Sequence, residues 1–326
     1  MQTKAELFRG PLIIVGLPRS GTKLLRDLLN QNPSISIPEG ETHFIPALIK
    51  KFKGNPPKNQ EELTRFFKMF TQVNFYHRMK KLGIELPQKQ FLNSVNQQSW
   101  ESIFGFILRF YSPKGLESKI YGDKTPQYLR YLELLKQTFP KAKFIHIVRD
   151  PRDYCISIKN IWGKNMFRAA YRWKTEIQQA HFTSEKFPDD FLEIQYEKLL
   201  ENPEKIMRKI CDFVSCSFDE NMLSLAKPAE NYGDAKDSLK IVSGNFMKYK
   251  SRLKTNELKK IEEIAFNQIV KSNYTLEIAS KSVEPTRLQL FWYQILDIIS
   301  LLNFHVKEKG LQNGINFILR NLRFKI

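Results

Sequence analysis

Residues 12–25 read LIIVGLPRSGTKLL, and this stretch decides the fold. The apolar run Leu12–Val15 predicts a buried strand, Gly16 and Gly21 bound a tight loop, and a helix begins near Thr22. In such a unit the loop amides and the first-turn N–H groups point to one place, where the helix dipole adds positive potential. The stretch therefore predicts an anion-binding site.

The loop departs from the Walker A phosphate-binding motif at its end. That motif places a lysine and then a hydroxyl residue directly after its last glycine. Here Gly21 is followed by Thr22 and then Lys23, and the cation within the loop is Arg19. The pair that grips a β/γ-phosphate and its Mg²⁺ is missing, which favours a nucleotide other than ATP, bound without a metal.

The composition is that of a basic α/β protein with a substantial core. The 326 residues are 42% apolar, and 52 lysines and arginines against 34 aspartates and glutamates give a net charge of +18. A basic surface suits nucleotides, acidic polymers, nucleic acid or anionic membranes. No nucleic-acid-binding motif accompanies the charge, so we expect no nucleic-acid partner.

The three cysteines, Cys155, Cys211 and Cys216, are too few for a disulfide framework and have no second Cys/His pair for zinc. They indicate buried thiols in a reducing compartment. Residues 1–9 lack the apolar core of a signal peptide, and no run reaches the roughly 18–20 apolar residues of a spanning helix. We expect a cytoplasmic protein.

Strand patterns alternate with helical patterns along the chain. The predicted strands are 12–15, 34–38, 143–148 and 191–196, and the core resumes after the insertion at 120–126. Helical patterns cover 127–138, the region from the end of the strand 191–196 to about Phe213, and 255–271. The alternation predicts an α/β fold of the P-loop type, with a doubly wound, mostly parallel sheet flanked by helices.

A long helical insertion, residues 41–115, separates the second and third predicted strands. It is rich in aromatic residues and is broken near 54–57 and at Pro87. Most of the aromatic residues are expected to form helix core, and the insertion is where this type of fold places an acceptor-binding surface. We expect a main domain at 1–284 and a helical C-terminal tail at 285–326.

A second candidate anion site lies at the end of the strand 143–148. Arg149 stands at the carboxyl end, where open α/β sheets bind ligands, and Ser157 follows about two helical turns later. Together they could hold a second phosphate by a bidentate fork and a hydroxyl. A structural pairing of Arg149 with Asp150 or Asp153 is the alternative.

With both motifs in this order, the chain resembles sulfotransferases that use 3′-phosphoadenosine 5′-phosphosulfate (PAPS). The loop Pro18–Thr22 resembles their 5′-phosphosulfate loop, and Arg149–Ser157 resembles their 3′-phosphate motif. Segments 16–25, 41–46 and 124–140 are similar to the tyrosylprotein branch. Segments 21–23 and 41–44 are similar to the heparan sulfate branch.

The resemblance implies cofactor contacts for particular residues. Those implied at the 5′-phosphosulfate are Arg19, Ser20, Gly21, Thr22, Lys23 and Leu24. Arg149 and Ser157 would bind the 3′-phosphate, and Tyr196 matches a tyrosine near the adenine. Lys248 matches a cofactor-contacting basic residue only when a gap is allowed.

The implied chemistry is in-line transfer to an acceptor hydroxyl, driven by positioning and charge stabilisation. Glu41 is the candidate base, and burial would have to raise its pKa; a helix-start role for Glu41 is the alternative. Arg19 and Lys124 would neutralise the leaving oxygen, unless Lys124 pairs with Asp123 on the surface. His43 could be the base, orient Glu41 or be an ordinary loop residue.

The acceptor stays open among carbohydrate, peptide tyrosine, lipid and small molecule. The tyrosylprotein branch has arginine at the position of His43, which argues against a peptide. Two other functions are alternatives. One is a P-loop ATP-dependent kinase with Asp150 as its Walker B acid, and the other is a non-catalytic nucleotide- or glycan-binding module.

Residues 288–304 are strongly apolar, with polar residues at every third position from 294 to 303, and basic residues dominate 305–326. One interpretation is an interfacial anchor, giving peripheral membrane contact through 288–326. The other is a terminal helical pair docked on the domain or on a second subunit, as in a homodimer. The sequence slightly favours docking, because Trp292 and Tyr293 can cap a core.

Overall fold

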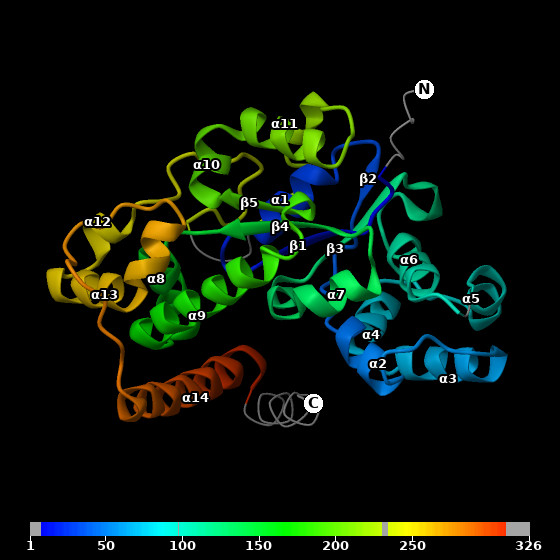
Figure 1. Ribbon diagram of the computed structural model, residues 1–326, viewed down its shortest axis with the longest axis horizontal. Coiled ribbons are helices and arrows are strands. Elements are labelled where there is room, and N and C mark those ends of the chain that lie inside the picture. Colours follow the sequence, from blue (N-terminus) through cyan, green and yellow to red (C-terminus); the bar gives the residue numbers. More distant parts are fainter. Residues whose placement is uncertain (1–7, 97, 230–233, 311–326) are drawn as a thin grey trace.

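The computed structural model describes residues 8–96, 98–229 and 234–310 (Figure 1). One five-stranded sheet has the order β2-β3-β1-β4-β5, and every neighbouring pair is parallel. The strands are β1 (Leu12–Gly16), β2 (Ile35–Ser36), β3 (Ile120–Lys124), β4 (Lys143–Val148) and β5 (Phe191–Gln195). The predicted doubly wound parallel sheet is confirmed.

The central strand β1 is buried on both faces, as its unbroken apolar run predicts. Leu12 and Ile14 join a cluster with α1 (Thr22–Leu29), α10 (Tyr196–Glu201) and α11 (Pro203–Phe213). Ile13 and Val15 point to the opposite face, toward α7 (Leu132–Thr138) and the helical insertion. Because side chains alternate along a strand, one four-residue run supplies both halves of the core.

The helical insertion is confirmed and forms its own lobe beside β3 (Figure 1). Its helices are α2 (Ile45–Lys51), α3 (Gln60–Phe70), α4 (Asn74–Lys81), α5 (Gln88–Ser94) and α6 (Trp100–Phe110). Phe66, Phe70 and Phe104 are fully buried, and the rings of Phe66 and Phe104 meet edge to face with centroids 5.7 Å apart. Most of the aromatic residues are core, as expected.

The expected single helix at 127–138 is wrong in its first half. Residues Pro126–Tyr131 form a 3₁₀ turn, and α7 begins only at Leu132. The Tyr128 hydroxyl lies 2.6 Å from the Thr42 hydroxyl and accepts the backbone N–H of Ile45. These tertiary bonds to the insertion hold the turn in the tighter winding.

Three helices pack together near Leu17 and Val148, at the carboxyl ends of β1 and β4: α8 (Pro151–Trp162), α9 (Met166–Ser184) and α13 (Thr255–Lys271). A short helix, α12 (Tyr249–Arg252), lies against α8. The last described helix, α14 (Arg287–Lys309), packs on α8 and α9, which supports docking on the domain. The second member of the expected helical pair falls in 311–326, outside the described residues.

A buried charge network joins α8 to α13. Arg152 is 2% exposed and donates to Asp150 by two of its nitrogens, at 2.9 and 2.5 Å, and to Glu262 at 2.8 Å. Glu262 is fully buried and also accepts the backbone N–H groups of residues 277–279. Arg152 therefore holds two carboxylates that have little or no access to water.

We expect Arg152→Leu to lower the free energy of unfolding by about 3–5 kcal/mol, because it leaves buried carboxylates without their cation. Urea titration measures the change. The control is Lys186→Ala, which removes a half-exposed ion pair with Glu133 and should change stability by less than about 1 kcal/mol. Equal effects of the two substitutions would contradict a structural role for the buried network.

Candidate functional site

The loop between β1 and α1 is an anion cradle. Arg19 and Gly21 have left-handed backbone, with φ of 74° and 90°. At Gly21 a side chain is excluded twice, because a Cβ would also lie 2.3 Å from Cδ2 of Tyr196. The first turn of α1 contains Thr22 and Lys23 and no acid, so its dipole is not offset there.

Ser20 provides direct support for a ligand at this loop. The residue is 1% exposed, and its Oγ has no hydrogen-bond partner among the described residues. A buried hydroxyl without a partner is costly. An anion held by the loop amides would give this hydroxyl an acceptor, so the cradle fits a phosphate or sulfonate group.

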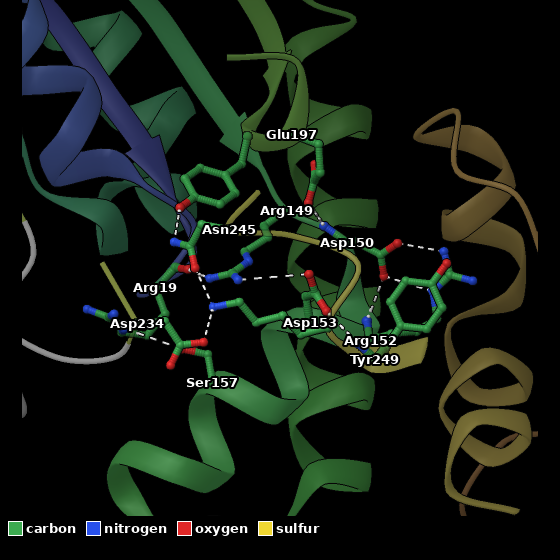
Figure 2. A network of polar contacts seen from close by, with 12 residues as sticks. Arg19, Arg149, Asp150, Arg152, Asp153, Ser157, Glu197, Asp234, Asn245 and Tyr249 are labelled. Carbon is green, nitrogen blue, oxygen red and sulfur yellow. Dashed lines mark hydrogen bonds and ion pairs between the residues drawn. The ribbon is translucent and has the colours of Figure 1, made fainter. Parts of the chain in front are cut away.

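The second predicted motif meets the first in space (Figure 2). Arg149 follows β4 and donates from Nη1 to the backbone oxygen of Arg19, at 3.0 Å. The Nε of Arg19 lies 3.5 Å from the Oγ of Ser157 on α8. Arg149 also lies over the ring of Tyr196, 4.8 Å from its centroid. Arg19 of the first motif and Arg149 and Ser157 of the second therefore line one pocket, whereas the loop residues 20–23 are not among its lining residues.

The pocket gathers predicted residues and adds others. Arg19, Arg149, Ser157, Tyr196 and Lys248 line it, together with Asp153, Ile156, Asn160, Ile161, Asp234, Ala235, Asn245 and Arg252. Leu24 lies in an adjoining, more apolar hollow that shares Tyr196. The structure thus brings Lys248 to the site in spite of the gap in its match.

The segment 234–252 contributes half of the lining residues that the sequence did not reveal, and α8 contributes the others. Asn245 donates to the Tyr196 hydroxyl at 2.8 Å and accepts from Lys248. Asp234 pairs with Lys248 at 2.6 Å and with Arg252 at 2.7 Å. The only signal in the sequence was the weak match at Lys248, because this segment has no strand or long helix to place it.

The alternative pairings of Arg149 are resolved by geometry. Asp153 lies 4.0 Å from Arg149 and accepts the backbone N–H of Tyr249 at 2.9 Å, and burial raises its pKa. Asp150 instead pairs with Arg152, so the suggested Arg149–Asp150 pair is wrong. The Nε of Arg149 is buried and has no partner among the described residues, which leaves donor capacity for a ligand.

The proposed base and cation are in direct contact with each other at the end of β3, and neither is among the residues that line the pocket. The Nζ of Lys124 lies 2.6 Å from Oε1 of Glu41, and Nε2 of His43 lies 2.9 Å from Oε2. Lys124 is buried at the end of β3, so the suggested surface pair with Asp123 is wrong. Glu41 precedes the N-cap of α2 by three residues and does not cap it.

The expected rise in the pKa of Glu41 is wrong for this arrangement. Burial acts to raise the pKa, but hydrogen bonds from His43 and Lys124 and the charge of Lys124 outweigh it. The pKa is lowered to about 2. Glu41 is therefore ionised, and it becomes a stronger base only if Lys124 turns to another acceptor.

Glu197 holds the backbone of the Arg149–Ser157 motif in place at Asp150. Its Oε1 accepts the backbone N–H of Asp150 at 3.0 Å, and its Oε2 accepts the hydroxyl of Tyr274 at 2.7 Å. Trp173 donates from its indole to the backbone oxygen of Arg149 at 2.9 Å. Burial raises the pKa of Glu197 to about 7, so this carboxyl is partly protonated near neutrality.

Within residues 8–96, 98–229 and 234–310, no group of three or more His, Cys, Asp and Glu side chains is arranged to hold a metal ion.

Comparison with known proteins identifies relatives. Residues 11–220 match the model of the family described as "Sulfotransferase family". Protein-tyrosine sulfotransferase 1 of Danio rerio is 26% identical over 224 residues, which cover 65% of this chain and 55% of that protein. Protein-tyrosine sulfotransferase A of Caenorhabditis elegans is 27% identical over 223 residues, covering 65% and 51%. This chain thus spans about half the length of these relatives.

One solved structure shares the fold. The sulfotransferase domain from the curacin biosynthetic pathway superposes with a TM-score of 0.56 at 20% identity. The match covers 83% of this chain and all of that domain.

We expect the stability of this protein to fall from about pH 5 to about pH 8, and Glu197→Gln to flatten the decline. The native pKa of about 7 lies above the ordinary 4.5, so the contribution of Glu197 is present at low pH and is lost as the pH rises through 7. A glutamine is neutral throughout. Urea titrations across this range measure the slope.

The control is Glu201→Gln, because Glu201 lies on the same helix and forms a partly exposed pair with Lys198. It should leave the slope unchanged. Asp123, whose pKa burial raises to about 6, adds a slope common to all three proteins. An unchanged slope in Glu197→Gln would show that Glu197 does not carry the proton.

Proposed function

The chain belongs to the sulfotransferase family, and we propose that it transfers the sulfuryl group of PAPS to an acceptor hydroxyl. The observation that carries the proposal is the bond from Arg149 to the backbone oxygen of Arg19, which brings the loop after β1 to the residue after β4, where Arg19, Arg149 and Ser157 line one pocket. A nucleotide with phosphate groups at both its 5′ and 3′ positions matches such a pair of sites. ATP has no 3′-phosphate to use the second.

The residues of the pocket suit such a donor. The amides from Arg19 to Lys23 and the hydroxyls of Ser20 and Thr22 would hold the 5′-phosphosulfate. Arg149 and Ser157 would bind the 3′-phosphate, and Lys248 would add charge on the same wall. Tyr196, with Leu24 in the adjoining hollow, would face the adenine. The bound donor would supply an activated sulfuryl group.

Lys124 would stabilise the charge on the leaving oxygen, and Glu41, held by His43, would accept the proton of the acceptor hydroxyl. Lys124 and Arg19 would neutralise the leaving oxygen, and Lys124 would give up its hydrogen bond to Glu41 as it does so. The pKa of Glu41 would rise at that moment, so the carboxylate could take the acceptor proton. His43 would hold the carboxylate by its second oxygen.

The kinase alternative depends on Asp150. A Walker B acid needs a carboxylate that is open to a metal or its water. Both oxygens of Asp150 accept hydrogen bonds from the side chain of Arg152, and Oδ1 also caps α8 through the backbone N–H of Arg152. This use as a structural acceptor argues against a kinase, and the proposed transfer needs no metal.

The acceptor and the cellular location belong to the proposal as well. A hydroxyl of a carbohydrate, peptide tyrosine, lipid or small molecule would reach Glu41 from the side of the insertion. Cys155 and Cys211 are buried and Cys216 is half-buried, and all three are free thiols. This pattern suits a reducing, cytoplasmic location.

We expect 3′-phosphoadenosine 5′-phosphate (PAP) to raise the melting temperature more than ADP does, because only PAP has a 3′-phosphate for Arg149 and Ser157. A ligand at about 100 times its Kd stabilises by about 2.7 kcal/mol. Arg149→Ala should remove most of the difference between the two nucleotides, and Arg208→Ala, on α11, should leave it intact. Equal shifts with PAP and ADP would contradict a 3′-phosphate site.

We expect Glu41→Gln to lower kcat by about 10²–10⁴-fold, because the proton of the acceptor loses its base. Transfer of label from [³⁵S]PAPS to a panel of hydroxyl acceptors, in the presence of EDTA, measures the rate. The control is Glu39→Gln, whose carboxylate pairs with Lys227 at the surface. It should keep the activity.

Other outcomes separate the alternatives. PAP binding with no transfer to any acceptor would favour the non-catalytic module. Activity that needs ATP and Mg²⁺ would favour the kinase. Full activity in Glu41→Gln would move the base to another residue.

A further inference from the structure

Helix α14 is attached to the domain by the side that carries Asp297, with Leu290 and Tyr293 half-buried on that side. Asp297 is 4% exposed, accepts the backbone N–H of Asn165 at 2.7 Å and pairs with Arg168 at 2.5 Å. The ring of Tyr293, one turn earlier, lies 6.0 Å from the ring of Phe167 on α9. The acid of this helix is thus buried against the N-terminus of α9.

The opposite side of α14 is apolar and faces solvent. Residues spaced by three and four positions define this outer face: Leu288, Phe291, Trp292, Ile295, Ile298, Ile299 and Leu302. Six of them are between 37% and 66% exposed, and Ile295 is half-buried. None of the seven is polar, so the helix presents a continuous apolar stripe.

An ordinary docked helix buries its apolar stripe, whereas α14 leaves this stripe in solvent. Figure 1 shows α14 at the edge of the molecule, below α9. A contiguous exposed apolar patch of this kind marks an interaction surface. In the part of the chain that the structure describes, no helix is long and apolar enough to cross a membrane.

The charge around the outer face indicates its partner. The chain carries a net charge of +18, and a second copy would bring an equal positive charge to the contact. In the sequence, the last turn of the helix and the residues after it, 305–326, contain Lys307, Lys309, Arg320, Arg323 and Lys325 against one acid, Glu308. An anionic surface is therefore favoured over self-association.

We propose that the outer face of α14 inserts into the headgroup region of an anionic lipid bilayer, with the helix parallel to the membrane. Phe291 and Trp292 suit the apolar–polar boundary, and basic residues beside the helix would contact the lipid phosphates. The attachment through Asp297 would then hold the enzyme domain at the membrane. This binding is separate from sulfuryl transfer and does not depend on it.

Co-sedimentation of the full chain with vesicles tests the proposal. We expect binding to vesicles of phosphatidylcholine with phosphatidylglycerol, and much weaker binding to phosphatidylcholine alone. Ile298→Glu and Trp292→Glu should each weaken binding by at least about tenfold, because a carboxylate would have to enter the apolar boundary. Both side chains are exposed, so the melting temperature should not change.

The matched control is Leu82→Glu, which makes the same change in charge at an equally exposed apolar residue outside α14. It should bind vesicles as the unmodified chain does. A second readout is fluorescence: vesicles should shift the tryptophan emission to the blue, and Trp292→Phe should abolish the shift.

Four results would overturn the proposal. The first is no binding to anionic vesicles, and the second is equal binding by Ile298→Glu and the unmodified chain. The third is a chain that does not bind vesicles but forms a dimer in light scattering, which Ile298→Glu dissociates. The fourth is binding to vesicles that appears only when residues 311–326 are removed. The last two would assign the outer face to a second copy and to the C-terminal segment.

Discussion

The site depends on the parallel pairing of β1 with β4. Their register aligns Gly16 with Ile147, so both strands end at the same edge of the sheet, one strand spacing apart. The loop after β1 and the residue after β4 therefore meet, and Arg149 reaches the backbone oxygen of Arg19. Any slip in this register would separate the two anion sites.

Buried charges hold this edge in place. Glu197 accepts a hydrogen bond from the backbone N–H of Asp150, and the indole of Trp173 donates to the backbone oxygen of Arg149. Arg152 donates to both Asp150 and Glu262 and so links α8 to α13. Each group is satisfied within the protein, so Arg149 is held from behind and its side chain is directed to the pocket. Rigidity of this kind favours selective binding, because little ordering is left to be done by the ligand.

The sequence predicted those features that follow from local pattern. Apolar periodicity, glycine and proline predict the strand, loop and helix at 12–29. The same signals predict the strand before Arg149 and the helical character of the insertion. The 3₁₀ turn at 126–131 was not predicted, because it depends on hydrogen bonds from Tyr128 to Thr42 and Ile45 in the insertion. The pKa of Glu41 was missed because it depends on Lys124, which is 83 residues away in the chain.

By itself, the sequence determined the strand, loop and helix at 12–29, the strand before Arg149 and the helical pattern of the insertion, since each depends on neighbours within a few residues. Tertiary structure alone decided that Asn245 and Asp234 line the same pocket as Arg149, and that Glu41 is already paired. It also decided which side of α14 faces out, because the bond between Asp297 and Arg168 turns the side that carries Asp297 inward. These outcomes rest on contacts between segments whose separation in the chain leaves no local pattern.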